Sequence, residues 1–96
     1  MLEGEIALVT GASPGIGQAI ALALGRAGAV VGGTATTEAG AERISETLAA
    51  NGCEGAGLVL DVADSLSVDS LMERMRSDLG EPSILVNNAG ITRDNL

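Results

Sequence analysis

Residues 6–17 have the sequence IALVTGASPGIG, and this stretch decides the fold. Its first four residues are consecutive apolar side chains, which is typical of a parallel strand buried on both faces. The glycines that follow, Gly11, Gly15 and Gly17, have the spacing G-x-x-x-G-x-G. Residues without Cβ allow a tight turn and a close approach of the backbone to a ligand. The stretch therefore predicts a strand, a glycine loop and the start of a helix.

The rest of the chain alternates between short apolar runs and helical periodicity. Strands alternating with helices imply right-handed crossovers and a parallel sheet, so we expect an α/β fold. We predict a single domain over residues 1–96 with four strands in the order 3-2-1-4 and three helices. The predicted strands are 6–9, 29–31 (ending at Gly32-Gly33), 58–60 and 84–86, and the helices begin near residues 16, 37 and 65.

The periodicity also predicts which helix faces are buried. Thr36 or Thr37 is expected to cap the second helix, and Asp64 or Ser65 the third. Gly28, Asn51-Gly52 and Gly80 are expected to end the three helices. The expected inward positions are Ile16, Ala19, Ile20, Ala23, Leu24 and Ala27 in the first helix, Ala41, Ile44 and Leu48 in the second, and Val68, Leu71, Met72, Met75 and Leu79 in the third.

A glycine loop between a strand and a helix favours binding of a dinucleotide, because the helix N-terminus offers N–H groups to phosphates. The alternative is a glycine-rich turn that binds nothing. Asp61-Val62 and Asn87-Asn88-Ala89-Gly90 follow the third and fourth strands, and ligands of open α/β sheets bind beyond the carboxyl ends of strands. Helix capping explains Asp61 equally well, and a plain turn is the alternative for the Asn-Gly segment. Paired Asn side chains there can also bridge the backbones of neighbouring strands.

Composition excludes most proton-transfer chemistry within this chain. There is no His, Lys, Tyr, Phe or Trp, and the net charge is −8. The usual donors and acceptors of general acid–base catalysis are therefore missing, and no metal site is predicted. The negative charge argues against nucleic-acid or anionic-membrane partners. The single Cys53 is expected to be an inert or mildly reactive thiol. The absence of a signal-like segment favours the cytoplasm.

Together, the glycine loop, Asp61-Val62 and Asn87-Asn88-Ala89-Gly90 make the chain similar to the first half of the short-chain dehydrogenases/reductases, which have a doubly wound Rossmann-type sheet. Within that family, residues 6–13, 33–36 and 86–96 resemble the bacterial 3-oxoacyl-(acyl-carrier-protein) reductases most. The resemblance implies NADPH-dependent reduction of 3-oxoacyl thioesters in fatty-acid synthesis. The alternatives are a family member acting on another carbonyl or alcohol, or a nucleotide-binding module without catalysis.

The resemblance also implies roles for individual residues. Asn87 would be mainly structural. The others would bind cofactor: Gly11, Ser13, Gly15, Ile16 and Gly17 at the pyrophosphate and adjacent ribose, Asp61 and Val62 at the adenine, and Asn88, Ala89 and Gly90 at the ribose and nicotinamide.

Cofactor choice depends on two departures from the family pattern. NADPH-preferring members often carry Arg where this chain has Pro14, which has neither charge nor N–H. NAD-preferring members carry an acid after the second strand, and this chain has none there. The hydroxyls of Thr34 and Thr36 can donate to a phosphate, so we expect NADP(H) to be favoured over NAD(H).

The catalytic Ser, Tyr and Lys of the family lie in its second half, which has no counterpart here. We therefore expect this chain to be a truncated, cofactor-binding half of an enzyme that is active, and tetrameric, only when intact. Its acyl-carrier-protein-linked substrate would be bound elsewhere.

Overall fold

The computed structural model describes residues 1–61 and 64–88. Val62, Ala89 and Gly90, which the family resemblance implicated in cofactor binding, lie outside the described residues. The elements follow the order β1 (Ile6–Thr10), α1 (Ile16–Arg26), β2 (Val30–Ala35), α2 (Glu38–Ala50), β3 (Gly55–Val59), α3 (Ser65–Asp78) and β4 (Ile84–Asn87).

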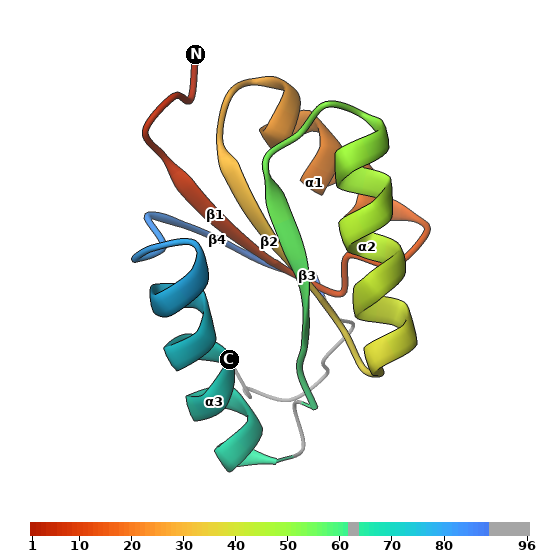
Figure 1. The fold of residues 1–96 in the computed structure, drawn as a ribbon, viewed down its shortest axis with the longest axis vertical. Helices are drawn as coiled ribbons and strands as arrows, with labels where there is room; N and C mark the ends of the chain where they lie inside the picture. The colour runs from red at the N-terminus through yellow and green to blue at the C-terminus, as the bar shows by residue number, and fades with distance from the viewer. Residues whose placement is uncertain (62–63, 89–96) are drawn as a thin grey trace.

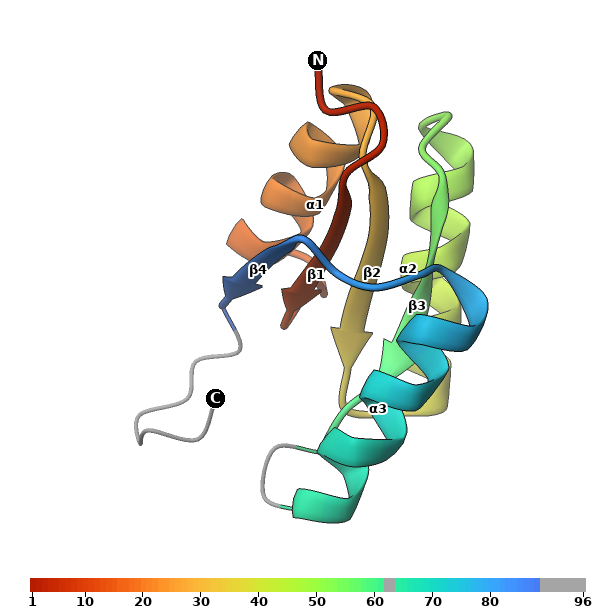
Figure 2. The same ribbon diagram turned by 90° about the vertical axis from the view of Figure 1, so that its left-hand side faces the viewer.

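The four strands form one parallel sheet in the order β3-β2-β1-β4, which confirms the predicted topology. Helices α1 and α2 cover one face of this sheet, and α3 covers the other (Figures 1 and 2). In the register of the sheet, Thr10 of β1 is opposite Asn87 of β4. The loops after β1 and β4 therefore begin side by side at the carboxyl edge.

Each face of the sheet has its own apolar core. Beneath α1 and α2, Val9 and Val31 are fully buried among residues that include Ile44 and Leu48. Beneath α3, Leu8 and Leu58 pack with Leu71 and Met75. The inward faces predicted for the second and third helices are thus confirmed. The predicted caps Thr37 and Asp64 accept hydrogen bonds from the N–H groups of Gly40 and Leu66, respectively.

The predicted face of the first helix was partly wrong. Ile16 is 73% exposed, and Ala19 and Ala23 are also exposed. The residues of α1 that are buried are Gly17 and Ala21. Larger side chains of α1 do reach the core, since Ile20, Leu22 and Leu24 pack against it, so the predicted face was displaced and not absent.

Two strand boundaries also differ from the prediction. β2 continues to Ala35, two residues beyond Gly33, and β3 begins at Gly55 and ends at Val59. The first difference arises at Gly32-Gly33, which were interpreted as the end of the second strand, and the second arises because β3 includes Gly55, Ala56 and Gly57. Between these two strands the backbones of Gly32 and Gly33 pair with Ala56 and Gly57, so hydrogen bonding maintains the strands where apolar side chains are missing. No helix in the described residues is long and apolar enough to cross a membrane.

Candidate functional site

The glycine loop leaves the end of β1 in a shape that its glycines make possible. Gly11 has φ +66°, and Gly15, the N-cap of α1, has φ +123°. No side chain caps the helix at Gly15. Within the described residues, the N–H groups of Ile16 and Gly17 have no hydrogen-bond acceptor. These N–H groups and the positive end of the helix dipole can therefore bind an anion.

Gly17 lets the helix approach the loop closely. A Cβ at Gly17 would lie 1.8 Å from the carbonyl oxygen of Gly11 and 2.6 Å from the side-chain nitrogen of Asn88. The first contact cannot be relieved without moving the backbone of the loop, because the carbonyl oxygen of Gly11 is a backbone atom. Gly15 differs, because no atom lies within 4 Å of its would-be Cβ. The third glycine thus sets the packing of the helix, while the second leaves open space over the loop.

Strand β2 holds the loop from one side. The N–H of Gly11 donates to the hydroxyl of Thr34 over 3.0 Å, and the N–H of Ala12 donates to the carbonyl oxygen of Thr34 over 2.9 Å. Thr34 is 2% exposed. The expectation that its hydroxyl donates to a phosphate was therefore wrong, because this hydroxyl is buried and accepts from the loop. A lone polar residue in an apolar, glycine-rich strand was the signal for this role.

The end of β4 holds the loop from the other side. The side chain of Asn88 donates to the carbonyl oxygen of Gly11 over 3.1 Å, and its backbone N–H donates to the hydroxyl of Thr10 over 2.9 Å. The Thr10 hydroxyl in turn donates toward the side-chain oxygen of Asn87, 3.2 Å away. This confirms that the paired Asn residues bridge neighbouring strands. Thr10, which is 1% exposed, joins them and was missed in the sequence.

The remaining predicted residues surround this loop at the carboxyl edge of the sheet. Ser13, Gly15 and Ile16 are exposed, and so is Thr36, directly after β2. Asp61 is also exposed, and its backbone N–H donates to the hydroxyl of Ser67 in α3. In the described residues, no group of three His, Cys, Asp or Glu side chains has an arrangement that fits a metal ion.

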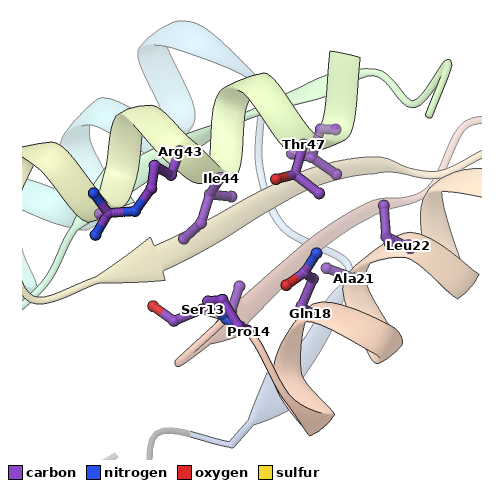
Figure 3. A pocket seen from close by; sticks show the side chains of 11 residues that line it. Ser13, Pro14, Gln18, Ala21, Leu22, Arg43, Ile44 and Thr47 are labelled. Atoms are coloured by element: carbon purple, nitrogen blue, oxygen red, sulfur yellow. The ribbon is translucent and has the colours of Figure 1, made fainter. Parts of the chain in front are cut away.

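A cleft of about 270 Å³ opens beside the loop, between α1 and α2. Ser13 and Pro14 line one side, and Arg43 and Ile44 of α2 line the other (Figure 3). Gln18, Ala21, Leu22, Thr47 and Leu48 continue the lining along the two helices. Arg43 was missed as a residue of this site. It is separated from Ser13 by 30 positions, and only the packing of α2 beside α1 brings both to one cleft.

The geometry fits a ligand that contains a diphosphate. The exposed loop offers backbone N–H groups, its shape is held by Thr34 and Asn88, and the space above Gly15 is open. A nucleotide bound across the carboxyl edge would meet the loop first, and Thr36 and Asp61 are exposed at the ends of the next two strands.

The chain is similar to known proteins of one family along almost its whole length. The family model of the short chain dehydrogenases matches residues 5–96. Over 95 residues the chain is 68% identical to 3-oxoacyl-(acyl-carrier-protein) reductase of Pseudomonas aeruginosa, covering 99% of this chain and 38% of that protein. It is 61% identical over 94 residues to the Escherichia coli enzyme of the same name, covering 98% of this chain and 37% of that protein. It is 57% identical over 95 residues to the Haemophilus influenzae enzyme of that name, with 99% and 38% covered. The chain thus spans less than two-fifths of the length of these relatives.

Proposed function

The chain belongs to the short-chain dehydrogenase family, and from this premise we propose that it forms the cofactor-binding half of a reductase that uses NADP(H) in preference to NAD(H). The glycine loop would hold the pyrophosphate and adjacent ribose through the N–H groups of Ile16 and Gly17. The observation that carries this proposal is the combination of those unpartnered N–H groups with a loop held open and rigid by Thr34 and Asn88.

Other residues would complete the cofactor site. Asp61 and Val62 would contact the adenine, whose exocyclic amine is a donor that a carboxylate accepts. Asn88, Ala89 and Gly90 would line the ribose and nicotinamide. Within this set, the Asn88 side chain already donates to Gly11, so its contribution would be to position the loop.

For the whole protein we propose reduction of 3-oxoacyl thioesters carried on acyl carrier protein, in the cytoplasm and as a homotetramer. The name shared by the three relatives supports this substrate class. The bound cofactor would supply the hydride. This chain contains no Tyr, Lys or His, so its own contribution would be to bind and orient the cofactor rather than to donate the proton.

The binding proposal is tested on the chain itself by calorimetric titration with NADPH. Ser13→Asp places a carboxylate at the loop, where it would repel the pyrophosphate, and should weaken binding at least about tenfold. Ser77→Asp adds the same charge on exposed α3, on the other face of the sheet, and should leave binding unchanged. Equal effects of the two substitutions, or no binding by the unchanged chain, would overturn the proposal.

The substrate proposal needs a chimera in which this chain replaces the corresponding segment of the Pseudomonas aeruginosa relative. Oxidation of NADPH with an acetoacetyl thioester is the expected result. A chimera that binds NADPH but reduces only other carbonyl compounds would favour a different member of the family. A chimera that binds NADPH and reduces no carbonyl compound would favour a nucleotide-binding module.

A further inference from the structure

Arg43 has an unusual position for a charged residue of this chain. It is one of five arginines in a chain with 13 acidic residues. Its side chain lies at the α1–α2 cleft, and the guanidinium extends toward the carboxyl end of β2 (Figure 3). In residues 1–61 and 64–88 it forms neither an ion pair nor a hydrogen bond. A cation is therefore available at the mouth of the cleft.

The acidic residues of α2 face another direction. Glu38 and Glu42 line a shallow depression that reaches Gly57 of β3. Arg43 follows Glu42 directly, and successive residues of an α-helix point about 100° apart. Arg43 therefore faces α1, while those two carboxylates face β3. In the part of the chain that the structure describes, no ion pair joins Arg43 to Glu38, Glu42 or Glu46.

On the opposite side of the cleft, Pro14 offers neither a charge nor an N–H. The other polar groups near the mouth are the hydroxyl of Ser13, which lines the cleft, and Thr36, which is exposed after β2. Hydroxyls alone discriminate weakly between a phosphate and a hydroxyl group, because either can be their hydrogen-bond partner. A guanidinium discriminates strongly, since its planar fork matches phosphate oxygens and its charge is permanent.

Resting on the function proposed above, we propose that Arg43 is the specificity residue that binds the 2′-phosphate of NADP(H), supplying from α2 the positive charge that Pro14 does not supply from the loop. The ligand group is a phosphate monoester on the ribose next to the adenine. The pyrophosphate would lie on the loop itself, where Ile16 and Gly17 have their N–H groups. Arg43 would thus determine the choice between the two dinucleotides without affecting the common part of their binding.

The test compares 2′,5′-ADP with 5′-AMP, since the two differ only in the 2′-phosphate. Calorimetric titration of the chain should show tighter binding of 2′,5′-ADP. Arg43→Gln should weaken the binding of 2′,5′-ADP about tenfold and change the affinity for 5′-AMP by less than about twofold. Arg43→Lys should retain part of the preference. Arg74→Gln removes the same charge from exposed α3 and should change neither affinity.

The outcomes separate this inference from the function on which it rests. If the unchanged chain binds neither nucleotide, the proposed function fails. If it binds 5′-AMP but Arg43→Gln leaves the preference for 2′,5′-ADP intact, or weakens both nucleotides equally, the assignment of Arg43 fails. Inorganic phosphate is the third probe. If it binds as tightly as 2′,5′-ADP and Arg43→Gln abolishes that binding, Arg43 is a general anion site and the assignment is overturned. Urea denaturation of each variant shows that it is folded.

Discussion

The side-chain amide of Asn88 donates a hydrogen bond to the carbonyl oxygen of Gly11 over 3.1 Å, although 77 positions separate the two residues. The bond joins the end of β4 to the first residue of the glycine loop. Because β4 pairs with β1, its end lies beside the loop, and β4 completes the shape of the loop that follows β1. The shape of a glycine loop near the N-terminus thus depends on a residue 77 positions further along the sequence.

Removing this bond should therefore loosen the loop and the sheet together. Asn88→Ala should lower the free energy of unfolding by about 1 kcal/mol, as expected for a part-buried hydrogen bond. Asn88→Asp should cost more at neutral pH, because a carboxylate would face the Gly11 carbonyl oxygen. Urea denaturation of the chain measures both. Asn51→Ala, at an exposed helix end, is the control and should lower the free energy of unfolding by less. An equal decrease at the two sites would contradict the role given to Asn88.

The stability of the chain should also depend on the hydroxyl of Thr34, which holds the loop from the side of β2. Thr34→Val has nearly the same shape but leaves the Gly11 N–H without its acceptor, which should cost about 1–3 kcal/mol. Thr34→Ser retains the hydroxyl and should lose less than about 1 kcal/mol for the missing methyl group. Denaturation midpoints distinguish the two variants. Equal destabilisation by valine and serine would mean that packing, and not the hydrogen bond, is what Thr34 contributes.

The two later glycines of the loop should differ in their tolerance of a side chain. Gly17→Ala places Cβ against the Gly11 carbonyl oxygen and should cost about 3 kcal/mol or more, because backbone atoms cannot rotate away. Gly15→Ala meets open space, and only the positive φ opposes it, at about 1–3 kcal/mol. In thermal denaturation, Gly17→Ala should unfold at a lower midpoint temperature than Gly15→Ala. The reverse order would show that backbone strain, and not the approach of α1, is the stronger constraint.

The adjacent threonines after β2 should separate stability from binding. Thr37→Ala removes the cap of α2 and should cost about 1 kcal/mol. Thr36→Ala, at an exposed position, should change stability little but weaken NADPH more than NADH if its hydroxyl binds the 2′-phosphate. Denaturation and titration on the same two variants test both statements. If Thr37→Ala instead lost NADPH binding selectively, Thr37 and not Thr36 would be the residue that binds the 2′-phosphate.

An arginine at position 14 should be able to replace the positive charge of Arg43. Pro14→Arg in the Arg43→Gln background should restore most of the preference for 2′,5′-ADP over 5′-AMP, because a guanidinium would again lie at the mouth of the cleft. When Arg43 is present, Pro14→Arg should increase the preference for 2′,5′-ADP by less than it does in the Arg43→Gln variant, because Arg43 already pairs with the 2′-phosphate. A gain of the same size in both backgrounds would indicate that the two arginines bind independently and at different places.

Sequence patterns were sufficient for the topology. Consecutive apolar residues such as those of β1, alternating with helical periodicity, allow few arrangements other than a parallel sheet with right-handed crossovers. They were insufficient for the ends of β2 and β3, where glycines are paired through backbone hydrogen bonds that side-chain hydrophobicity does not record. They were also misleading for α1, where the hydrophobic Ile16 is exposed while Gly17, which has no side chain, is buried against the carbonyl oxygen of Gly11.

The sequence by itself determined that this chain has a strand, a glycine loop and a helix in that order, with Gly11, Gly15 and Gly17 between the end of the strand and the first turn of the helix. These features are local, since each depends on residues a few positions apart. Only the tertiary structure decided which groups hold the loop and which residues share its cleft. Thr34, Asn88 and Arg43 reach the loop from 23 to 77 positions away because parallel strands bring their carboxyl ends, and the helices that follow them, to one edge of the sheet.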